Sequence, residues 1–154
     1  MALALQKILI PAPDRPQTPP LVEAEPRLNI EVVFTSVEAT LVALRRAADL
    51  ANRLAARITL VVPQVVPNPL PLESPPVLLD WNERRFRVIA EESQVEMTVQ
   101  IYLCRDRVQA LCALVKPRSV VVLGGRKAWW PTPETRLARK LRRAGHEVIL
   151  VETE

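Results

Sequence analysis

IEVVFTSVEATLVALRRAADLANRLAARITLVV, residues 30–62, is the stretch that decides the fold. It opens with a short β-branched run at residues 30–34, which predicts a strand. Thr35 and Glu38 then have the spacing of a capping box. Apolar residues follow at helical spacing, at Val37, Leu41, Leu44, Ala48 and Ala51. A second apolar run at residues 58–62 predicts another strand. The order of strand, helix and strand indicates two parallel strands joined by a right-handed crossover.

The chain after this unit continues the alternation of strands and helices. It is interrupted by one proline-rich stretch, which must be a loop. The expected elements are the loop at residues 63–79, a helix at 80–93, a strand at 97–103, a helix capped by Asp106 that stops before Pro117, a strand at 119–123 ended by Gly124 and Gly125, a helix capped by Thr132 and ended by Gly145, and a strand at 148–151. Such alternation predicts an α/β domain with a parallel sheet of five strands.

The first 28 residues differ from the rest, and we expect a proline-rich N-terminal tail at 1–28 before a domain at 29–154. Residues 11–28 hold Pro11, Pro13, Pro16, Pro19, Pro20 and Pro26, which exclude a helix or a central strand. Lys7 to Ile10 has two further interpretations. It is an edge strand added to the sheet, or, with Asp14 behind it, the opening strand of the fold in another register. The second requires a helix that the prolines do not allow.

Composition narrows the class of protein. Cys104 and Cys112 lie in apolar surroundings and are interpreted as buried free thiols, which fits a reducing cytoplasm. No segment approaches the roughly 18 apolar residues of a membrane span, and the N-terminus lacks the pattern of a signal peptide. The net charge is +4, but residues 126–143 hold seven basic residues and one acid, a charge of +6, which leaves −2 for the rest.

Four phrases of the sequence resemble the universal stress proteins. Residues 43–56 resemble the family's first helix and residues 60–62 the strand after it. Residues 106–108 resemble the acidic start of the third helix, and residues 120–124 the strand that leads to the phosphate loop. The nearest likeness is to the stress-protein-like domain of osmosensing potassium sensor kinases, although no kinase feature is present. The resemblance implies a three-layer sandwich with strand order 3-2-1-4-5. It also implies a nucleotide site where strands one and four part.

The resemblance also implies which residues would line that site, and here the chain departs from the family. Nucleotide-binding members have an Asp where Thr35 stands, and a second loop glycine where Lys127 stands. They have Gly-Ser or Gly-Thr where Glu134 and Thr135 stand. The motif is therefore degraded. The candidate ligand-binding residues are Thr35, Ser36, Gly124, Gly125, Arg126, Lys127, Thr132 and Thr135.

Each conspicuous motif has a functional and a structural interpretation. Gly124 to Lys127 would hold a phosphate, or would form a turn into a solvated loop. Trp129 and Trp130 would stack on adenine, or one would cover the core while the other faces a partner chain. The basic helix at residues 136–143 would bind nucleic acid or anionic lipid, or would be a solvated face. Because no aromatic residue is interleaved with its charges, nucleic acid is the less favoured partner.

No catalytic constellation or metal-ligand spacing is found, and His146 stands alone after Gly145. We therefore expect a universal stress protein-like domain of the stress response that is not an enzyme. It would have no tightly bound cofactor and would act through protein–protein contacts, as a homodimer or with an unknown partner. The alternative is a sensor that holds ATP or another phosphate ligand weakly through a remodelled loop at residues 124–127.

Overall fold

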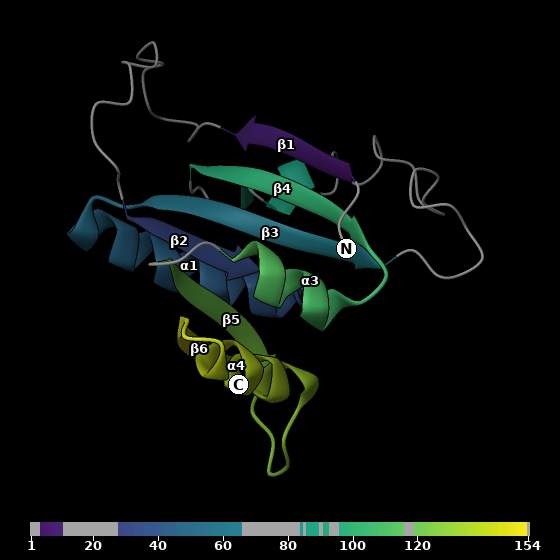
Figure 1. The fold of residues 1–154 in the computed structure, drawn as a ribbon. Helices are drawn as coiled ribbons and strands as arrows, with labels where there is room; N and C mark the ends of the chain where they lie inside the picture. Colours follow the sequence, from purple (N-terminus) through teal and green to yellow (C-terminus); the bar gives the residue numbers. More distant parts are fainter. Residues whose placement is uncertain are drawn as a thin grey trace.

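The computed structural model describes residues 4–10, 28–65, 84, 86–89, 91–92, 96–115 and 119–153. Its six strands form one sheet in the order β1-β4-β3-β2-β5-β6 (Figure 1). They are β1 (Ala4–Ile10), β2 (Asn29–Val33), β3 (Arg57–Val65), β4 (Met97–Cys104), β5 (Val120–Arg126) and β6 (Glu147–Thr153). The strands from β4 to β6 are parallel. This arrangement confirms the predicted order 3-2-1-4-5, with the strand at Ile30 in the middle.

β1 is the sixth strand, and it runs antiparallel along β4, from Ala4 opposite Leu103 to Ile10 opposite Met97. The interpretation of Lys7 to Ile10 as an edge strand is therefore confirmed. The alternative register is wrong, because it needs this segment in the middle of the sheet. The sheet thus begins at Ala4, not near Asn29. The extended tail predicted for residues 11–28 lies outside the described residues, apart from Leu28.

The helices are α1 (Val37–Leu54), α3 (Arg107–Leu114) and α4 (Pro133–Arg143), and residues 84, 86–89 and 91–92 are also helical. The predicted caps Asp106 and Thr132 are confirmed, since each side chain accepts a bond from the backbone N–H three residues on. Gly145 has the expected left-handed backbone, with φ of 94°. The predicted cap of α1 is wrong by one residue, because the Ser36 hydroxyl accepts from Ala39 N.

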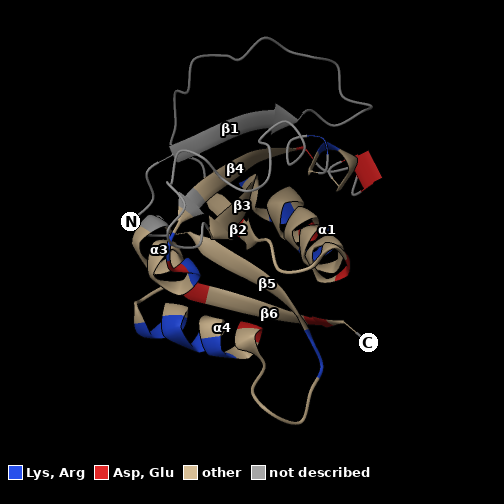
Figure 2. Ribbon diagram, turned by 90° about the vertical axis from the view of Figure 1, so that its right-hand side faces the viewer, with Lys and Arg blue, Asp and Glu red and all other residues tan. Residues whose placement is uncertain are grey.

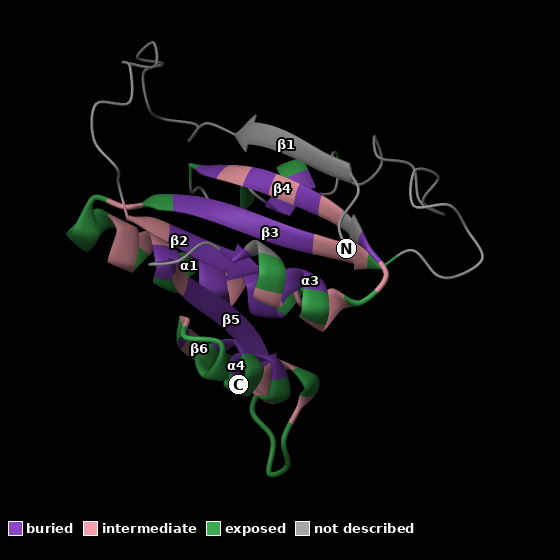
Figure 3. Ribbon diagram, viewed as in Figure 1, coloured by how far each residue is buried: buried purple, intermediate pink, exposed green. Residues whose placement is uncertain are grey.

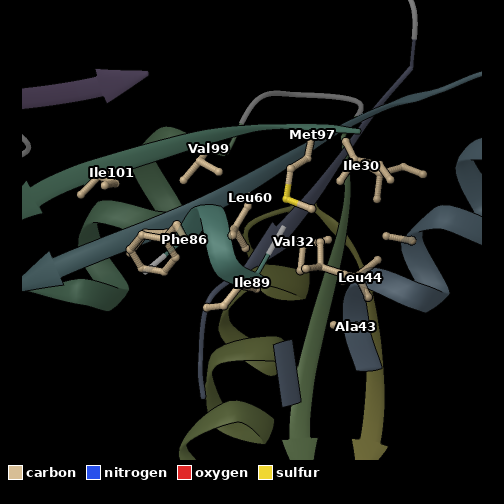
Figure 4. Close-up of a cluster of buried hydrophobic side chains, with 14 residues drawn as sticks. Ile30, Val32, Ala43, Leu44, Leu60, Phe86, Ile89, Met97, Val99 and Ile101 are labelled. Carbon is tan, nitrogen blue, oxygen red and sulfur yellow. The ribbon is translucent and has the colours of Figure 1, made fainter. Parts of the chain in front are cut away.

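Two apolar clusters place helices on both faces of the sheet, which confirms the three layers. One cluster joins α1 and the helical residues Phe86 and Ile89 to one face of the sheet, as Figure 4 shows with Leu44, Leu60 and Val99. The other cluster joins Leu111 of α3 and Leu137, Ala138 and Leu141 of α4 to the opposite face. The central strands are consequently the most buried part of the chain (Figure 3).

Strands β3, β4, β5 and β6 extend beyond their predicted ends, and two of these extensions concern prolines or glycines. β3 includes Pro63, which was expected in the loop. Pairing with β2 ends at Val61, so among the described strands Pro63 pairs with β4 alone, at Tyr102. Proline is tolerated where one side of a strand has no partner. β5 includes Gly124 and Gly125, which pair with Val151 and Glu152 of β6. The prediction that these glycines end the strand is therefore wrong.

Three findings concern expectations from composition. Both cysteines are free, Cys104 is buried and Cys112 is half-buried. Burial raises the pKa of the Cys104 thiol, and its Sγ lies 3.6 Å from the backbone oxygen of Gln64. Within the part of the chain that the structure describes, no helix is long and apolar enough to cross a bilayer. Those same residues contain no group of three potential metal ligands.

Candidate functional site

The candidate site lies at the carboxyl ends of β2 and β5, neighbouring central strands of the sheet. The chain leaves β2 into α1 on one face and leaves β5 toward α4 on the other. Ligands of open α/β sheets bind at such a switch point, where the two connections diverge. The predicted site residues are the last residues of β5 or lie on the segments that follow β2 and β5.

Thr35 and Gly124 meet at the centre of this region. The Thr35 hydroxyl donates a hydrogen bond of 2.9 Å to the backbone oxygen of Gly124. Thr35 N donates to the Thr40 hydroxyl over 3.2 Å. A Cβ added to Gly124 would lie 2.0 Å from the backbone oxygen of Ala39 in α1. Helix α1 therefore packs directly on the glycine backbone, and Gly124 serves close packing between helix and strand.

The space beside Gly125 is also filled by a neighbouring side chain. A Cβ added to it would lie 3.1 Å from Cβ of Glu134, and its backbone oxygen accepts a 3.3 Å hydrogen bond from the Thr153 hydroxyl. Among the described residues, positive φ occurs at Ala55 and Gly145 and not at this glycine pair. A phosphate-binding nest of successive N–H groups needs a left-handed residue. Gly124 and Gly125 therefore act as strand residues here.

Arg107, the first residue of α3, is a site residue that the sequence analysis missed. Its Nη2 donates a 2.9 Å hydrogen bond to the backbone oxygen of Phe34, at the end of β2. Burial lowers the pKa of Arg107, and the nearby carboxylate of Glu134 and then Cys104 oppose that shift. Its buried Nε has no hydrogen-bond partner among the residues that the structure describes. In the sequence Arg107 looks like any other arginine, because only its cap neighbour Asp106 gave a signal.

The remaining predicted residues divide between caps and surface. Ser36 caps α1. Thr132 caps α4, and its hydroxyl lies 3.0 Å from the hydroxyl of Thr135. Arg126 and Lys127 are exposed at the end of β5. Thr35 and Gly124 are thus joined by a hydrogen bond. Arg126 and Lys127 are near them because they follow Gly124 and Gly125 in the sequence.

Trp129 and Trp130 lie on the connection that projects from the sheet beyond α4 (Figure 1). Their exposed fractions are 101% and 78%. The interpretation in which one of them covers the core is wrong. The connection turns away from the sheet, so neither indole reaches the apolar clusters.

An open groove of about 550 Å³ lies at the opposite, amino-terminal end of the sheet. Leu28, Ile30, Leu54 and Ile149 contribute its apolar lining, with Ser119 and Glu147 beside them. This hollow is separate from the switch point and contains none of the predicted site residues.

Comparison with solved structures supports the fold. No family model matches the sequence, and no curated protein matches it either. A universal stress protein family member from Burkholderia pseudomallei is similar, with TM-score 0.55, 19% identity and coverage of 81% of this chain and 96% of that chain. The universal stress protein of Archaeoglobus fulgidus gives TM-score 0.59, 16% identity and coverage of 81% and 93%.

A third similar structure is a universal stress protein in complex with cAMP, with TM-score 0.53, 17% identity and coverage of 83% of this chain and 98% of that chain. All three align over almost the whole length of the solved chains. The chain therefore has the universal stress protein fold, an α/β fold with a parallel sheet between two layers of helices. The resemblance noted in the sequence is confirmed at the level of the fold.

Proposed function

We propose that this chain is a non-catalytic universal stress protein-like domain that acts by binding protein, first of all a second copy of itself. The observation that carries the proposal is the closed switch point. Thr35 bonds to Gly124, α1 packs on the Gly124 backbone, and Arg107 bonds to the end of β2. In these contacts the Thr35 hydroxyl and the backbones of Phe34 and Gly124 are already hydrogen-bonded or packed. A nucleotide at the switch point would otherwise approach these groups.

The self-association is proposed through β6, which is the last strand in the sheet order and, among the described residues, pairs with β5 alone. Its side chains from Val148 to Val151 are apolar and buried or half-buried. A paired edge removes the hazard that an apolar, unpaired strand presents. Sedimentation equilibrium at micromolar concentration is expected to show a dimer.

A substitution on this edge tests the dimer directly. Val151→Lys is expected to give a monomer, because a lysine on an edge strand opposes strand pairing. Val88→Lys is the matched control, since Val88 is an apolar residue with 60% exposure on another element. A monomeric wild-type protein of 17.3 kDa would contradict the proposed dimer.

Nucleotide titration tests the closed switch point. Calorimetry with ATP, ADP and cAMP is expected to give no binding tighter than about 1 mM, a free energy of about −4 kcal/mol. Thr35 offers no carboxylate, and the glycine pair has no left-handed residue with which to surround a phosphate.

The alternative function is a phosphate-ligand sensor, and the exposed cations Arg126 and Lys127 before the start of α4 favour it. A micromolar constant for ATP that disappears in Lys127→Ala, but persists in Lys140→Ala, would establish the sensor and overturn the closed site. Lys140 is an exposed lysine on the outer face of α4, so it controls for the loss of one charge.

A further inference from the structure

The connection between β5 and α4 exposes two tryptophans that neither the fold nor the proposed function uses. We define the tryptophan loop as residues 127–131. Trp129 and Trp130 are 101% and 78% exposed, and every residue of the loop is exposed. An indole has the largest apolar surface of any side chain, and large side chains of this kind stabilise a protein when they are buried. Two adjacent exposed indoles at a loop tip therefore indicate a contact outside this chain.

The neighbouring helix presents a basic surface. The buried side of α4 consists of Leu137, Ala138 and Leu141. We define the basic face as the exposed residues Arg136, Arg139, Lys140 and Arg143. Their spacing puts them on the side of the helix opposite the buried residues. In Figure 2 the blue segments mark the outer side of α4, and the tryptophan loop extends from its N-terminal end.

The single acid of this region does not neutralise the basic face. Cβ of Glu134 lies close to the backbone of Gly125, so its side chain starts against the sheet. Its carboxylate is near enough to oppose the lowered pKa of Arg107. Residues 126–143 thus hold +6 while the rest of the chain sums to −2. This uneven distribution of charge favours an anionic partner that contacts the side of the molecule where α4 lies.

We propose that the tryptophan loop and the basic face form a peripheral docking site for an anionic membrane surface. Tryptophan favours the interface between headgroups and acyl chains, and each basic residue near an anionic leaflet adds electrostatic attraction. Binding to a membrane surface strengthens with the apolar area buried in the interface and with the electrostatic attraction to anionic lipids. The loop projects beyond α4, which allows the indoles to enter the interface while the basic face rests on headgroups.

The geometry favours a lipid surface over single-stranded nucleic acid. Nucleic-acid binders of that class align aromatic side chains along a positively charged groove, so that successive bases stack on them. Here the two indoles are sequence neighbours at a projecting tip. The groove of about 550 Å³ described above lies at the other end of the sheet and is lined mainly by aliphatic residues.

The experiment is co-sedimentation of the full-length chain with vesicles of phosphatidylcholine alone and of phosphatidylcholine mixed with phosphatidylglycerol. Binding is expected to the mixed vesicles only and is expected to fall as salt is raised. In a Trp81→Phe background, which leaves Trp129 and Trp130 as the fluorophores, emission is expected to shift to the blue with the mixed vesicles.

Paired variants test each half of the site. Trp129→Ala with Trp130→Ala is expected to weaken binding to the mixed vesicles by roughly tenfold or more. Arg139→Glu with Arg143→Glu is expected to weaken it by roughly thirtyfold or more. Arg45→Glu with Arg46→Glu is the matched control, because these exposed arginines lie on α1, and it is expected to retain binding within about threefold. Circular dichroism melts check that each variant is folded.

Other outcomes overturn the proposal. Absence of binding to the mixed vesicles excludes it, as does equal binding to neutral vesicles. Binding that survives the loss of both tryptophans shows a purely electrostatic contact. Tight binding of a single-stranded oligonucleotide by a protein that ignores vesicles would assign this surface to nucleic acid. None of these results depends on the dimer or on nucleotide titration, so they leave the proposed function to its own tests.

Discussion

Two pairs of residues that are close together in the sequence have opposite environments. Gly124 and Gly125 are buried in β5, where α1 and Glu134 of α4 lie against their backbone. Trp129 and Trp130 follow after three residues and are almost fully exposed. In this stretch the smallest side chains are inside and the largest are outside. This inversion indicates that the glycine pair closes the switch point by packing, and that the tryptophan pair serves a contact beyond the chain.

Adding one methyl group to the buried pair is expected to have the largest effect. Gly124→Ala would place its Cβ 2.0 Å from the backbone oxygen of Ala39, so α1 or β5 must move. We expect a loss of about 3 kcal/mol or more in the free energy of unfolding, measured by urea denaturation.

Gly125→Ala is the matched control for that experiment. Its nearest contact is Cβ of Glu134 at 3.1 Å, so α4 need move by only a few tenths of an ångström. The expected loss is about 1 kcal/mol. Equal losses at both glycines would show that α1 does not lie against Gly124 as described.

Removing the hydroxyl of Thr35 tests how much its hydrogen bond to Gly124 contributes to the closed switch point. Thr35→Val loses the 2.9 Å hydrogen bond to the Gly124 oxygen and is expected to destabilise the fold by about 1 kcal/mol. Thr35→Ser keeps the hydroxyl and is expected to be closer to wild type. If both variants unfold at the same urea concentration, the hydrogen bond contributes nothing to closure.

The smallest effect on stability is expected at the largest side chains. Trp129→Ala with Trp130→Ala should change the free energy of unfolding by no more than about 0.5 kcal/mol. Loss of a buried tryptophan typically costs about 3–5 kcal/mol. A loss of that size in thermal or urea unfolding would place an indole in the core. It would remove the contrast between the two pairs.

Much of the fold was predictable because its signals are local. Hydrophobic periodicity identified each parallel strand, and Asp106 and Thr132 were recognisable as caps from their own neighbourhoods. The spacing of Thr35 and Glu38 misled, because two hydroxyl residues stand side by side there. Ser36 took the cap while Thr35 bonded across the sheet to Gly124.

The predicted site residues lie together at the ends of β2 and β5, as the resemblance implied, and ligand binding there stays a prediction. Their contacts were not predictable from the sequence. Gly124 and Gly125 have the composition of a phosphate loop. Their pairing with β6 depends on how far that strand extends. Arg107 gave no signal, because its bond to Phe34 joins residues 73 positions apart.

The sequence by itself therefore determined the alternation of strands and helices, the parallel core and the concentration of charge on the last helix. These properties follow from side chains that are neighbours in the chain or one helical turn apart. Only the tertiary structure decided that β1 joins the edge at β4, that α1 packs on Gly124, and that both tryptophans face outward. Those outcomes depend on contacts between distant segments, whose steric fit no local pattern encodes.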